Sequence, residues 1–356
     1  MNSKLTAPPS APLPVPFSIP YRRGLHFYGI LLSVCTFLLL FAGGMVTSTN
    51  SGLSVPDWPT TFGRNMFLFP PSMMKGGIFY EHGHRLFASL VGLLTIGNCL
   101  AFWILEKRKW LKWTGFVALL LVIVQGVLGG MTVRYKLPMP VSAAHACTAE
   151  LFFGLTLLMA FATSRAWMRA NPEPLRFSNR EQALSLAFCL AVFLQILVGA
   201  VMRHSYAGLS IPTFPMAYGQ WVPPFWNFGI AVHFLHTRIG ASLLVLLGAS
   251  LILAVVLSKA LPGKVKGLAG FLALALIVQC LLGMMTIWTG KAPVPTTFHL
   301  SVGALVFATG LLLFFAIYRF RMPVTERTET KGNAVTAHSA HPASIQNIPN
   351  DGVALT

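Results

Sequence analysis

The sequence predicts an all-α polytopic membrane protein whose eight transmembrane helices form two tandem, parallel four-helix bundles. Of the 356 residues, 55% are hydrophobic and 10% are charged, with a mean hydropathy of +0.68, whereas roughly a quarter of the residues in a soluble domain are charged. Several apolar runs are long enough to cross a hydrocarbon core about 30 Å thick, and the two halves of the chain repeat each other. A soluble enzyme or a nucleic-acid-binding protein is therefore not expected.

The eight predicted spans follow from runs of about 18 or more mostly apolar residues. They cover 24–46, 82–105, 113–133 and 142–164 in the first half, and 182–202, 229–258, 265–288 and 297–318 in the second. The Pro-rich segment 1–23 and the polar segment 321–356 have the composition of disordered tails. We expect 165–181 to be a cytoplasmic linker.

The net charge of +17 fits a membrane topology rather than an anionic partner. If the amino terminus is cytoplasmic, 18 of the 26 basic residues fall in cytoplasmic segments, as the positive-inside rule expects. The sequence therefore predicts a multi-pass protein of the cell inner membrane, surrounded by lipid, with both termini in the cytoplasm and no nucleic-acid partner.

The internal repeat gives the strongest indication of domain organisation. The loop 52–63 (GLSVPDWPTTFG) matches 208–219 (GLSIPTFPMAYG), and the segment 125–132 (QGVLGGMT) matches 279–286 (QCLLGMMT). Agreement at several glycine and polar positions is hard to attribute to shared hydrophobicity alone.

The repeat divides the chain into two four-helix units, 24–164 and 182–320. Because each unit has an even number of spans, both have the same orientation, related by an axis along the membrane normal. A four-helix bundle commonly holds a cofactor between its facing helices.

Four histidines, one near the outer end of each even-numbered span, are the leading candidates for function: His84, His145, His236 and His299. The first two are 61 residues apart and the last two are 63 apart, so each unit holds one pair at similar depth. Neutral imidazole is a good ligand for haem iron, and two imidazoles on opposite faces fill both axial positions. We therefore expect a di-haem protein.

Glu81 distinguishes the first unit from the second. It lies three residues before His84 and four before Arg85, so these groups share a helical face, whereas His233 occupies the matching position in the second unit. A carboxylate at the edge of a membrane span is costly, which makes it a functional candidate. The alternative interpretation is that Glu81 only pairs with Arg85.

Three arginines, Arg85, Arg203 and Arg238, lie near the histidines on the outer side, where we expect arginine to bind haem propionates bidentately. The long loop from Thr47 to Tyr80 carries several aromatic residues and is expected to shield an outer pocket from water. Glu150 is a second intramembrane acid, for which a functional role and a bond to a neighbouring hydroxyl are equal alternatives.

Together these features resemble the haem A synthase family, the membrane enzymes that make haem A for terminal oxidases. The resemblance covers about residues 25–320. It rests on short motifs at Gly43-Gly44, 51–58 (SGLSVPDW), 81–85 (Glu-x-x-His-Arg, which contains His84), 125–129 and 279–283. The other three histidines, His145, His236 and His299, each near the start of a predicted helix, add to it.

The resemblance implies that the C8 methyl of haem O is oxidised to the formyl group of haem A. A first hydroxylation gives an alcohol, and a second gives a gem-diol that loses water. It further implies that His84 and His145 hold the substrate haem, with Glu81 close to the reaction, and that His236 and His299 hold a b-type haem that relays electrons. Haem O synthase and cytochrome oxidase assembly factors are the implied partners, the electron donor is unknown, and a homo-oligomer is compatible with the pattern.

Two departures from the family pattern matter. Some bacterial members carry a cysteine pair in the first outer loop, and this chain has none there. The second unit reads His236-Thr237-Arg238 where arginine usually follows histidine directly, which leaves His233 as an alternative ligand. The rival hypotheses are a quinone-linked, di-haem b-type electron carrier without haem-modifying activity and, more distantly, a haem transporter or chaperone.

Overall fold

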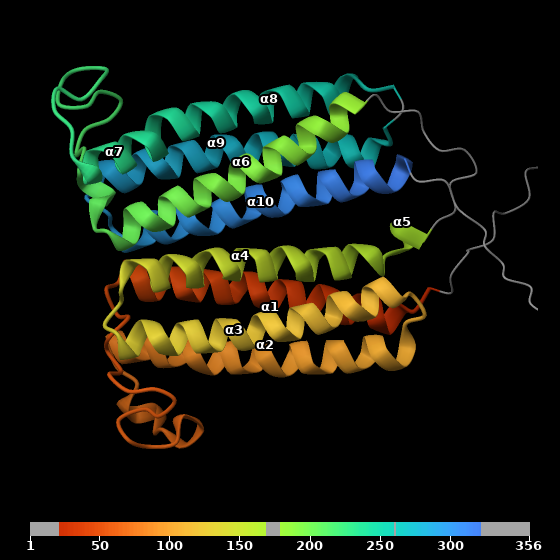
Figure 1. Cartoon of the computed structure of the whole chain (residues 1–356), viewed down its shortest axis with the longest axis horizontal. Helices are drawn as coiled ribbons and strands as arrows, with labels where there is room; N and C mark the ends of the chain where they lie inside the picture. The colour runs from red at the N-terminus through yellow and green to blue at the C-terminus, as the bar shows by residue number, and fades with distance from the viewer. Residues whose placement is uncertain (1–20, 169–178, 260, 322–356) are drawn as a thin grey trace, which may run out of the picture. The chain divides into compact units, whose positions relative to one another are not determined.

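The computed structural model describes residues 21–168, 179–259 and 261–321, which are mainly helical (Figure 1). Within them, eight helical runs are long and apolar enough to cross a membrane. They are α1 (Arg23–Ser48), α2 (Gly77–Leu105), α3 (Lys109–Arg134), α4 (Met139–Ala162), α6 (Asn179–His204), the continuous run α7 (Phe228–Phe234), η4 (Leu235–Gly240) and α8 (Ala241–Leu257), α9 (Gly263–Trp288) and α10 (Pro293–Arg321). The chain is therefore an all-α, multi-pass membrane protein, as predicted.

Several helices begin earlier than the apolar runs suggested. Helix α2 begins at Gly77 rather than 82, α3 at Lys109 rather than 113, and α10 at Pro293 rather than 297. The prediction followed hydrophobicity. A helix, however, continues into polar surroundings wherever its backbone hydrogen bonds are satisfied. Proline also fits the first turn of a helix, because that turn needs no amide donor.

The predicted tails and linker fall largely outside the described residues. Helix α1 begins at Arg23 and α10 ends at Arg321. Within the predicted linker, Arg165–Met168 form the short helix α5, and α6 begins at Asn179.

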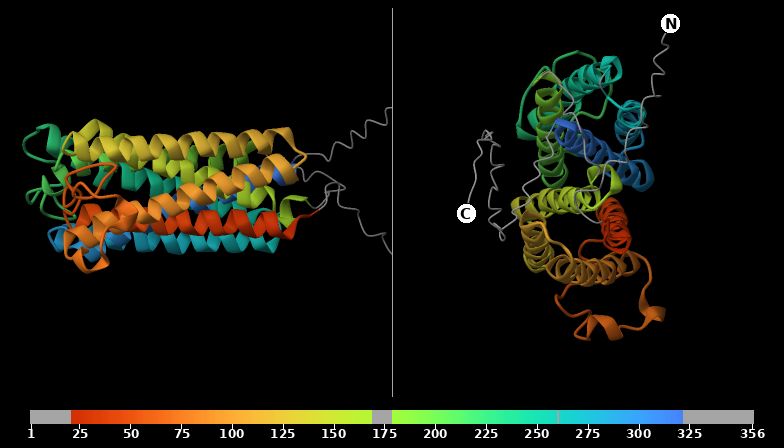
Figure 2. Two further views of the ribbon diagram at one scale, coloured as in Figure 1. Left: turned by 90° about the horizontal axis from the view of Figure 1, so that it is seen from below. Right: turned by 90° about the vertical axis from the view of Figure 1, so that its right-hand side faces the viewer.

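The helices contact one another in two rings, seen end-on in Figure 2. In the first ring α1 and α3 each contact both α2 and α4, and in the second α6 and α9 each contact both α8 and α10. The rings meet where α1 and α4 contact α10 and where α4 contacts α6. Helices α2 and α4 therefore occupy opposite corners of one ring, as α8 and α10 do in the other.

The two long connections, between α1 and α2 and between α6 and α7, lie at the same end of the helices (Figure 1). The first includes the short helices η1 (Met66–Leu68) and η2 (Pro71–Met73), and the second includes η3 (Ala207–Leu209). Both connections contain the same tight turn, in which Thr61 pairs with Arg64 and Ala217 pairs with Gln220 through backbone hydrogen bonds.

Glycine is needed in both turns, because the backbone is left-handed there. Gly63 has φ +73° and Gly219 has φ +81°, values that glycine adopts without steric cost. The sequence repeat therefore corresponds to a repeat of local backbone geometry.

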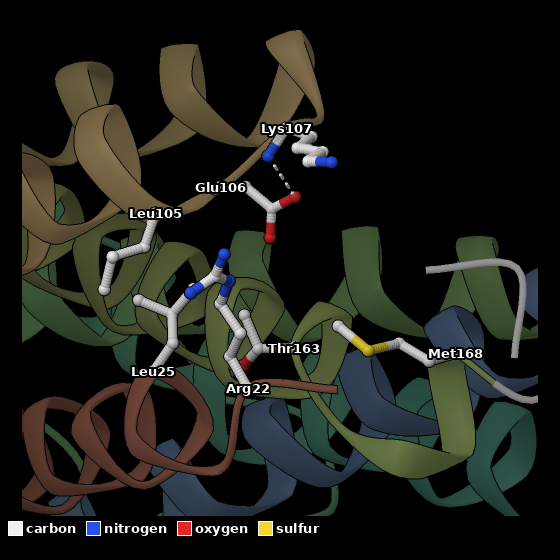
Figure 3. A pocket seen from close by; sticks show the side chains of 7 residues that line it. All are labelled: Arg22, Leu25, Leu105, Glu106, Lys107, Thr163 and Met168. Carbon is white, nitrogen blue, oxygen red and sulfur yellow. Dashed lines mark hydrogen bonds between the residues drawn. The ribbon is translucent and has the colours of Figure 1, made fainter. Parts of the chain in front are cut away.

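At the end of the helices opposite the two long connections, Glu106 and Arg108 link the ends of α2 and α3 to the end of α4. Its carboxylate accepts hydrogen bonds from the Arg108 guanidinium, whose Nη1 donates to the Ala162 carbonyl at 2.8 Å. Burial raises the pKa of Glu106, but the hydrogen bonds from Arg108 and the backbone outweigh it and hold the pKa below its usual range. A small pocket at this end is lined by Arg22, Leu25, Leu105, Glu106, Lys107, Thr163 and Met168 (Figure 3), none of which is a candidate site residue.

Candidate functional site

Each of the four candidate histidines lies against a glycine of the preceding helix. A Cβ atom placed on that glycine would lie close to the histidine Cε1, at 3.1 Å for Gly43 and His84, 3.3 Å for Gly129 and His145, 2.8 Å for Gly199 and His236, and 3.2 Å for Gly283 and His299. Because ordinary carbon contacts are about 3.5–4.0 Å, a side chain at these positions would crowd or displace the ring. We refer to these four approaches as the glycine–histidine contacts.

In the second unit, His236 and His299 lie close together. The ring centroids of His236 and His299 are 6.4 Å apart and the rings are inclined by 77°. A metal–imidazole nitrogen bond is about 2 Å long, so one metal ion between two rings needs a centroid separation of roughly 6 Å. His84 and His145 are also close enough to interact electrostatically.

Ring nitrogens without a hydrogen-bond partner also fit imidazoles that bind a metal ion. The Nδ1 atoms of His84, His145 and His236 are buried without a hydrogen-bond partner. Burying a polar atom unsatisfied is costly, so this arrangement suits rings whose binding capacity is met by a cofactor. Haem fits the two pairs, because its macrocycle supplies the ligands around the iron and leaves two axial positions for imidazole.

Three of the four histidines lie beside a glutamine. Each glutamine is four residues before the glycine of the same glycine–histidine contact. Gln125 Nε2 donates to the His145 carbonyl at 3.1 Å, and Gln195 Nε2 donates to the His236 carbonyl at 2.7 Å. Gln125 and Gln279 match each other in the sequence repeat, whereas the residue that matches Gln195 is Leu39. The repeat therefore gives no signal for Gln195.

The third glutamine contacts its histidine through the ring. His299 Nδ1 lies 3.3 Å from the Gln279 carbonyl, and the Gln279 side chain lies 3.5 Å from His299 Nε2.

Glu81 and Arg85 together anchor the loop between α1 and α2. Glu81 is 4% exposed and accepts hydrogen bonds from the Val55 amide at 2.8 Å and from Arg85 at 2.6 Å. Arg85 also donates to the carbonyls of Val55, Asp57 and Thr60. The pairing that was the alternative interpretation of Glu81 is thus present, and it fixes the loop one turn from His84.

Arg238 anchors the loop between α6 and α7 in the same way. Its guanidinium donates to the carbonyls of Thr213 and Met216, which match Asp57 and Thr60 in the repeat. It also lies over the Phe214 ring, 4.8 Å from the centroid. Propionate binding by Arg85 and Arg238 stays a prediction, and the contacts present are loop contacts.

The extra residue in the second unit is absorbed by the backbone. Residues Leu235–Gly240 form a π-helix, a form that accommodates one more residue within an α-helical run. His236 therefore keeps its contact with Gly199 while Arg238 reaches the same loop positions as Arg85. His233 is fully buried, its Nδ1 lies 3.4 Å from the Thr237 hydroxyl, and its Nε2 is unpartnered. The glycine–histidine contact favours His236 as the ligand.

The first loop lies over the outer end of α3. The Trp58 ring is so close to Gly130 that a Cβ there would lie 2.5 Å from it, and Gly130 follows the glycine that contacts His145. Asp57 shapes this loop by accepting hydrogen bonds from the amides of Phe62 and Gly63, both at 2.8 Å. The loop therefore packs against the end of α3 that also contacts His145, and its shielding of a pocket there stays a prediction.

Two other candidates lie where the rings meet. Arg203, near the end of α6, donates to the Ser48 hydroxyl of α1 at 3.1 Å and is electrostatically close to His299. Glu150 of α4 is buried, and its Oε2 has no hydrogen-bond partner, so the neighbouring hydroxyl suggested for it is not found at that atom.

Comparison with known proteins places these features in a family context. The model of the COX15-CtaA family, described as cytochrome oxidase assembly protein, matches residues 26–311. The chain is 32% identical over 234 residues to the Heme A synthase of Shouchella clausii, covering 64% of this chain and 74% of that protein. It is 28% identical over 313 residues to the Heme A synthase of Alkalihalophilus pseudofirmus, covering 85% and 98%. The Heme A synthase of Rhizobium johnstonii is 29% identical over 315 residues, covering 75% and 82%.

Proposed function

Because the chain belongs to the COX15-CtaA family of cytochrome oxidase assembly proteins, we propose that it is a haem A synthase, an oxidoreductase that converts haem O to haem A. The observation that carries the proposal is the set of four glycine–histidine contacts, arranged as two pairs. The similar proteins are named Heme A synthase, and the family resemblance implies the reaction. In it, the C8 methyl of haem O becomes a formyl group through two successive hydroxylations.

The two pairs are proposed to have different roles. His84 and His145 hold the substrate haem, and His236 and His299 hold a b-type haem. When bound, this second haem supplies one-electron redox chemistry. The proposed asymmetry is supported by the loop anchors, since a carboxylate, Glu81, serves the first loop and the matching residue of the second unit is His233.

Glu81 is proposed to act beside the substrate by holding the loop closed. Its two carboxylate oxygens are engaged by Val55 and Arg85, and the same loop places Trp58 against α3. A closed loop excludes water from the substrate and strengthens the electrostatic interactions inside the site.

The cellular setting follows from the same proposal. The distribution of basic residues supports a cell inner membrane location with cytoplasmic termini, which puts the histidine pairs near the outer face. Haem O synthase would supply the substrate, and cytochrome oxidase assembly would consume the product.

The proposal is tested by expressing the chain with a haem O source in a host that lacks haem A, then extracting and identifying the pigments. We expect haem A. Neither His84→Ala nor Glu81→Ala should produce haem A, while each keeps one b-type haem. His26→Ala is the matched control, because His26 contacts the Ala160 carbonyl at the far end of α1, and it should retain conversion.

Absence of haem A from a fully haem-loaded protein would favour the rival function, a di-haem electron carrier. The near-equal glycine–histidine contacts of the two pairs are the observation that supports this rival. If Glu81→Ala or His84→Ala instead removes all haem, the proposed division of roles is wrong.

A further inference from the structure

His84 is the candidate ligand for which no glutamine neighbour is found among the described residues, whereas each of the other three lies beside a glutamine side chain. Gln125 and Gln195 donate from their side chains to the carbonyls of His145 and His236, and the side chain of Gln279 lies 3.5 Å from Nε2 of His299. In α1, the position four residues before Gly43 is Leu39. Its apolar side chain packs against a core cluster that includes Leu32 and Phe152, so it has no donor to offer His84.

His84 is otherwise positioned like its counterparts. Its Cε1 lies near Gly43 as closely as the others approach their glycines, and its Nδ1 is buried and unpartnered like those of His145 and His236. Within the part of the chain that the structure describes, no side-chain donor is found on the His84 carbonyl. The missing glutamine is therefore the difference that separates His84 from the rest.

A side-chain donor on a helix carbonyl fixes the depth and rotation of that helix turn. Such interhelical hydrogen bonds are modest inside a membrane but measurable. A ligand without one opens more readily from its metal, since less is lost when its helix turn shifts. Within the first pair, His145, whose carbonyl accepts a hydrogen bond from Gln125, is the ligand that stays on the iron.

We propose that His84 is the displaceable ligand of the first pair and His145 the retained one. Substrate haem would enter and product would leave by making and breaking the His84–iron bond, with the bonding electron pair returning to the imidazole and no change of oxidation state. This inference rests on the proposed function, in which His84 and His145 hold the substrate haem.

The test uses carbon monoxide as a probe of the reduced, haem-loaded full chain. Carbon monoxide needs an open axial position, so its binding rate at the first pair reports how often a histidine leaves the iron. The relevant kinetic phase is identified as the one that remains in His299→Ala, which keeps only the haem of the first pair. Leu39→Gln should slow this phase by about threefold or more, the size of an average interhelical hydrogen bond.

Two further variants keep the test decisive. Leu39→Met has a similar volume and no donor, so it should bind carbon monoxide at the original rate. In the Leu39→Gln background, Gln125→Leu should restore fast binding, because His145 then becomes the looser ligand. If Leu39→Gln does not fold, Gln125→Leu alone should release its haem to apomyoglobin several-fold faster than the original chain.

Equal rates for Leu39→Gln and Leu39→Met, or unchanged haem release from Gln125→Leu, would overturn the inference. These readouts follow ligand exchange and not conversion. A chain that binds two haems and shows the expected ligand-exchange rates, but makes no haem A, would contradict the proposed function alone. A chain that loads haem only at His236 and His299 would contradict both.

Discussion

At the scale of single residues, glycine is the neighbour that decides where each imidazole lies. Gly199 makes the tightest of the four contacts, because its Cβ would lie 2.8 Å from Cε1 of His236. Alanine is as small a change as a side chain allows, and it improves helix propensity. Any loss of haem from such a variant therefore reports the ring contact and not a weakened helix.

We expect Gly199→Ala to retain haem poorly at the second pair. Forcing a methyl group into a packed site costs about 1–3 kcal/mol, which corresponds to haem loss faster by about tenfold. Gly126→Ala is the matched control, because a Cβ there meets nothing within 4 Å. Haem content is measured by absorbance after dialysis against apomyoglobin. Equal retention by both variants would mean that the contact does not position His236.

At the scale of elements, the π-helix Leu235–Gly240 explains how two units with different spacing keep the same site. One extra residue would rotate an α-helix by about 100°, which would turn Arg238 away from its loop or His236 away from Gly199. The wider π turn absorbs that rotation. Both contacts are present.

Deleting Thr237 should therefore be tolerated. The deletion converts the π-helix to a regular α-helix and gives the second unit the His-Arg spacing of His84 and Arg85. We expect the haem content and absorbance spectrum of the second pair to be unchanged. Deleting Val245, in the regular helix α8, should abolish haem binding there, because it misplaces a packed helix. The interpretation fails if the two deletions behave alike.

The first outer loop depends on the ionised carboxylate of Asp57. Burial raises the pKa of Asp57, but hydrogen bonds from Thr60, Gly63 and Phe62 outweigh it and hold the pKa below its ordinary value of 3.8. A carboxyl group with a lowered folded-state pKa stabilises the structure above that ordinary value, and its contribution disappears as pH falls through the folded-state pKa.

Loop opening should thus begin only below about pH 3.8. Hydrogen–deuterium exchange of segment 57–64, corrected for the intrinsic effect of pH, measures it. Asp57→Ala should exchange about fivefold faster near neutral pH, since it loses hydrogen bonds worth about 1 kcal/mol or more. The variant should also lose the acid-induced increase in the exchange rate of this segment. An acid-induced change that persists in Asp57→Ala would assign the loop's stability to another group.

The elements differ in how far their sequences predict them. The eight spans were predictable because each apolar run is long enough to cross a bilayer, and Gly129 and Gly283 were visible as repeat matches. The loop contacts of Arg85 and Arg238 were not predictable, because their acceptors there are backbone carbonyls, which any residue carries. The π-helix was equally hidden, since an inserted Thr237 reads in sequence only as a broken motif.

At the scale of the whole molecule, the two rings are held against each other by small and apolar residues. Phe153 of α4 packs with Ala304 and Ala308 of α10 in one buried cluster. Arg203 of α6 donates to Ser48 of α1 at 3.1 Å near the outer end. These contacts hold the two rings together, and the proposed electron relay between the two histidine pairs depends on that arrangement.

This arrangement predicts opposite defects for ligand losses in the two units. His299→Ala should lose the b-type haem, keep substrate haem at His84 and His145, and accumulate unconverted haem O, because electrons no longer reach the substrate. His84→Ala should keep the b-type haem and hold little substrate. Both are measured by extracting the pigments from purified protein and recording reduced-minus-oxidised spectra. Haem A formation by His299→Ala would show that electrons reach the substrate without the second haem, and the relay role of that pair would have to be abandoned.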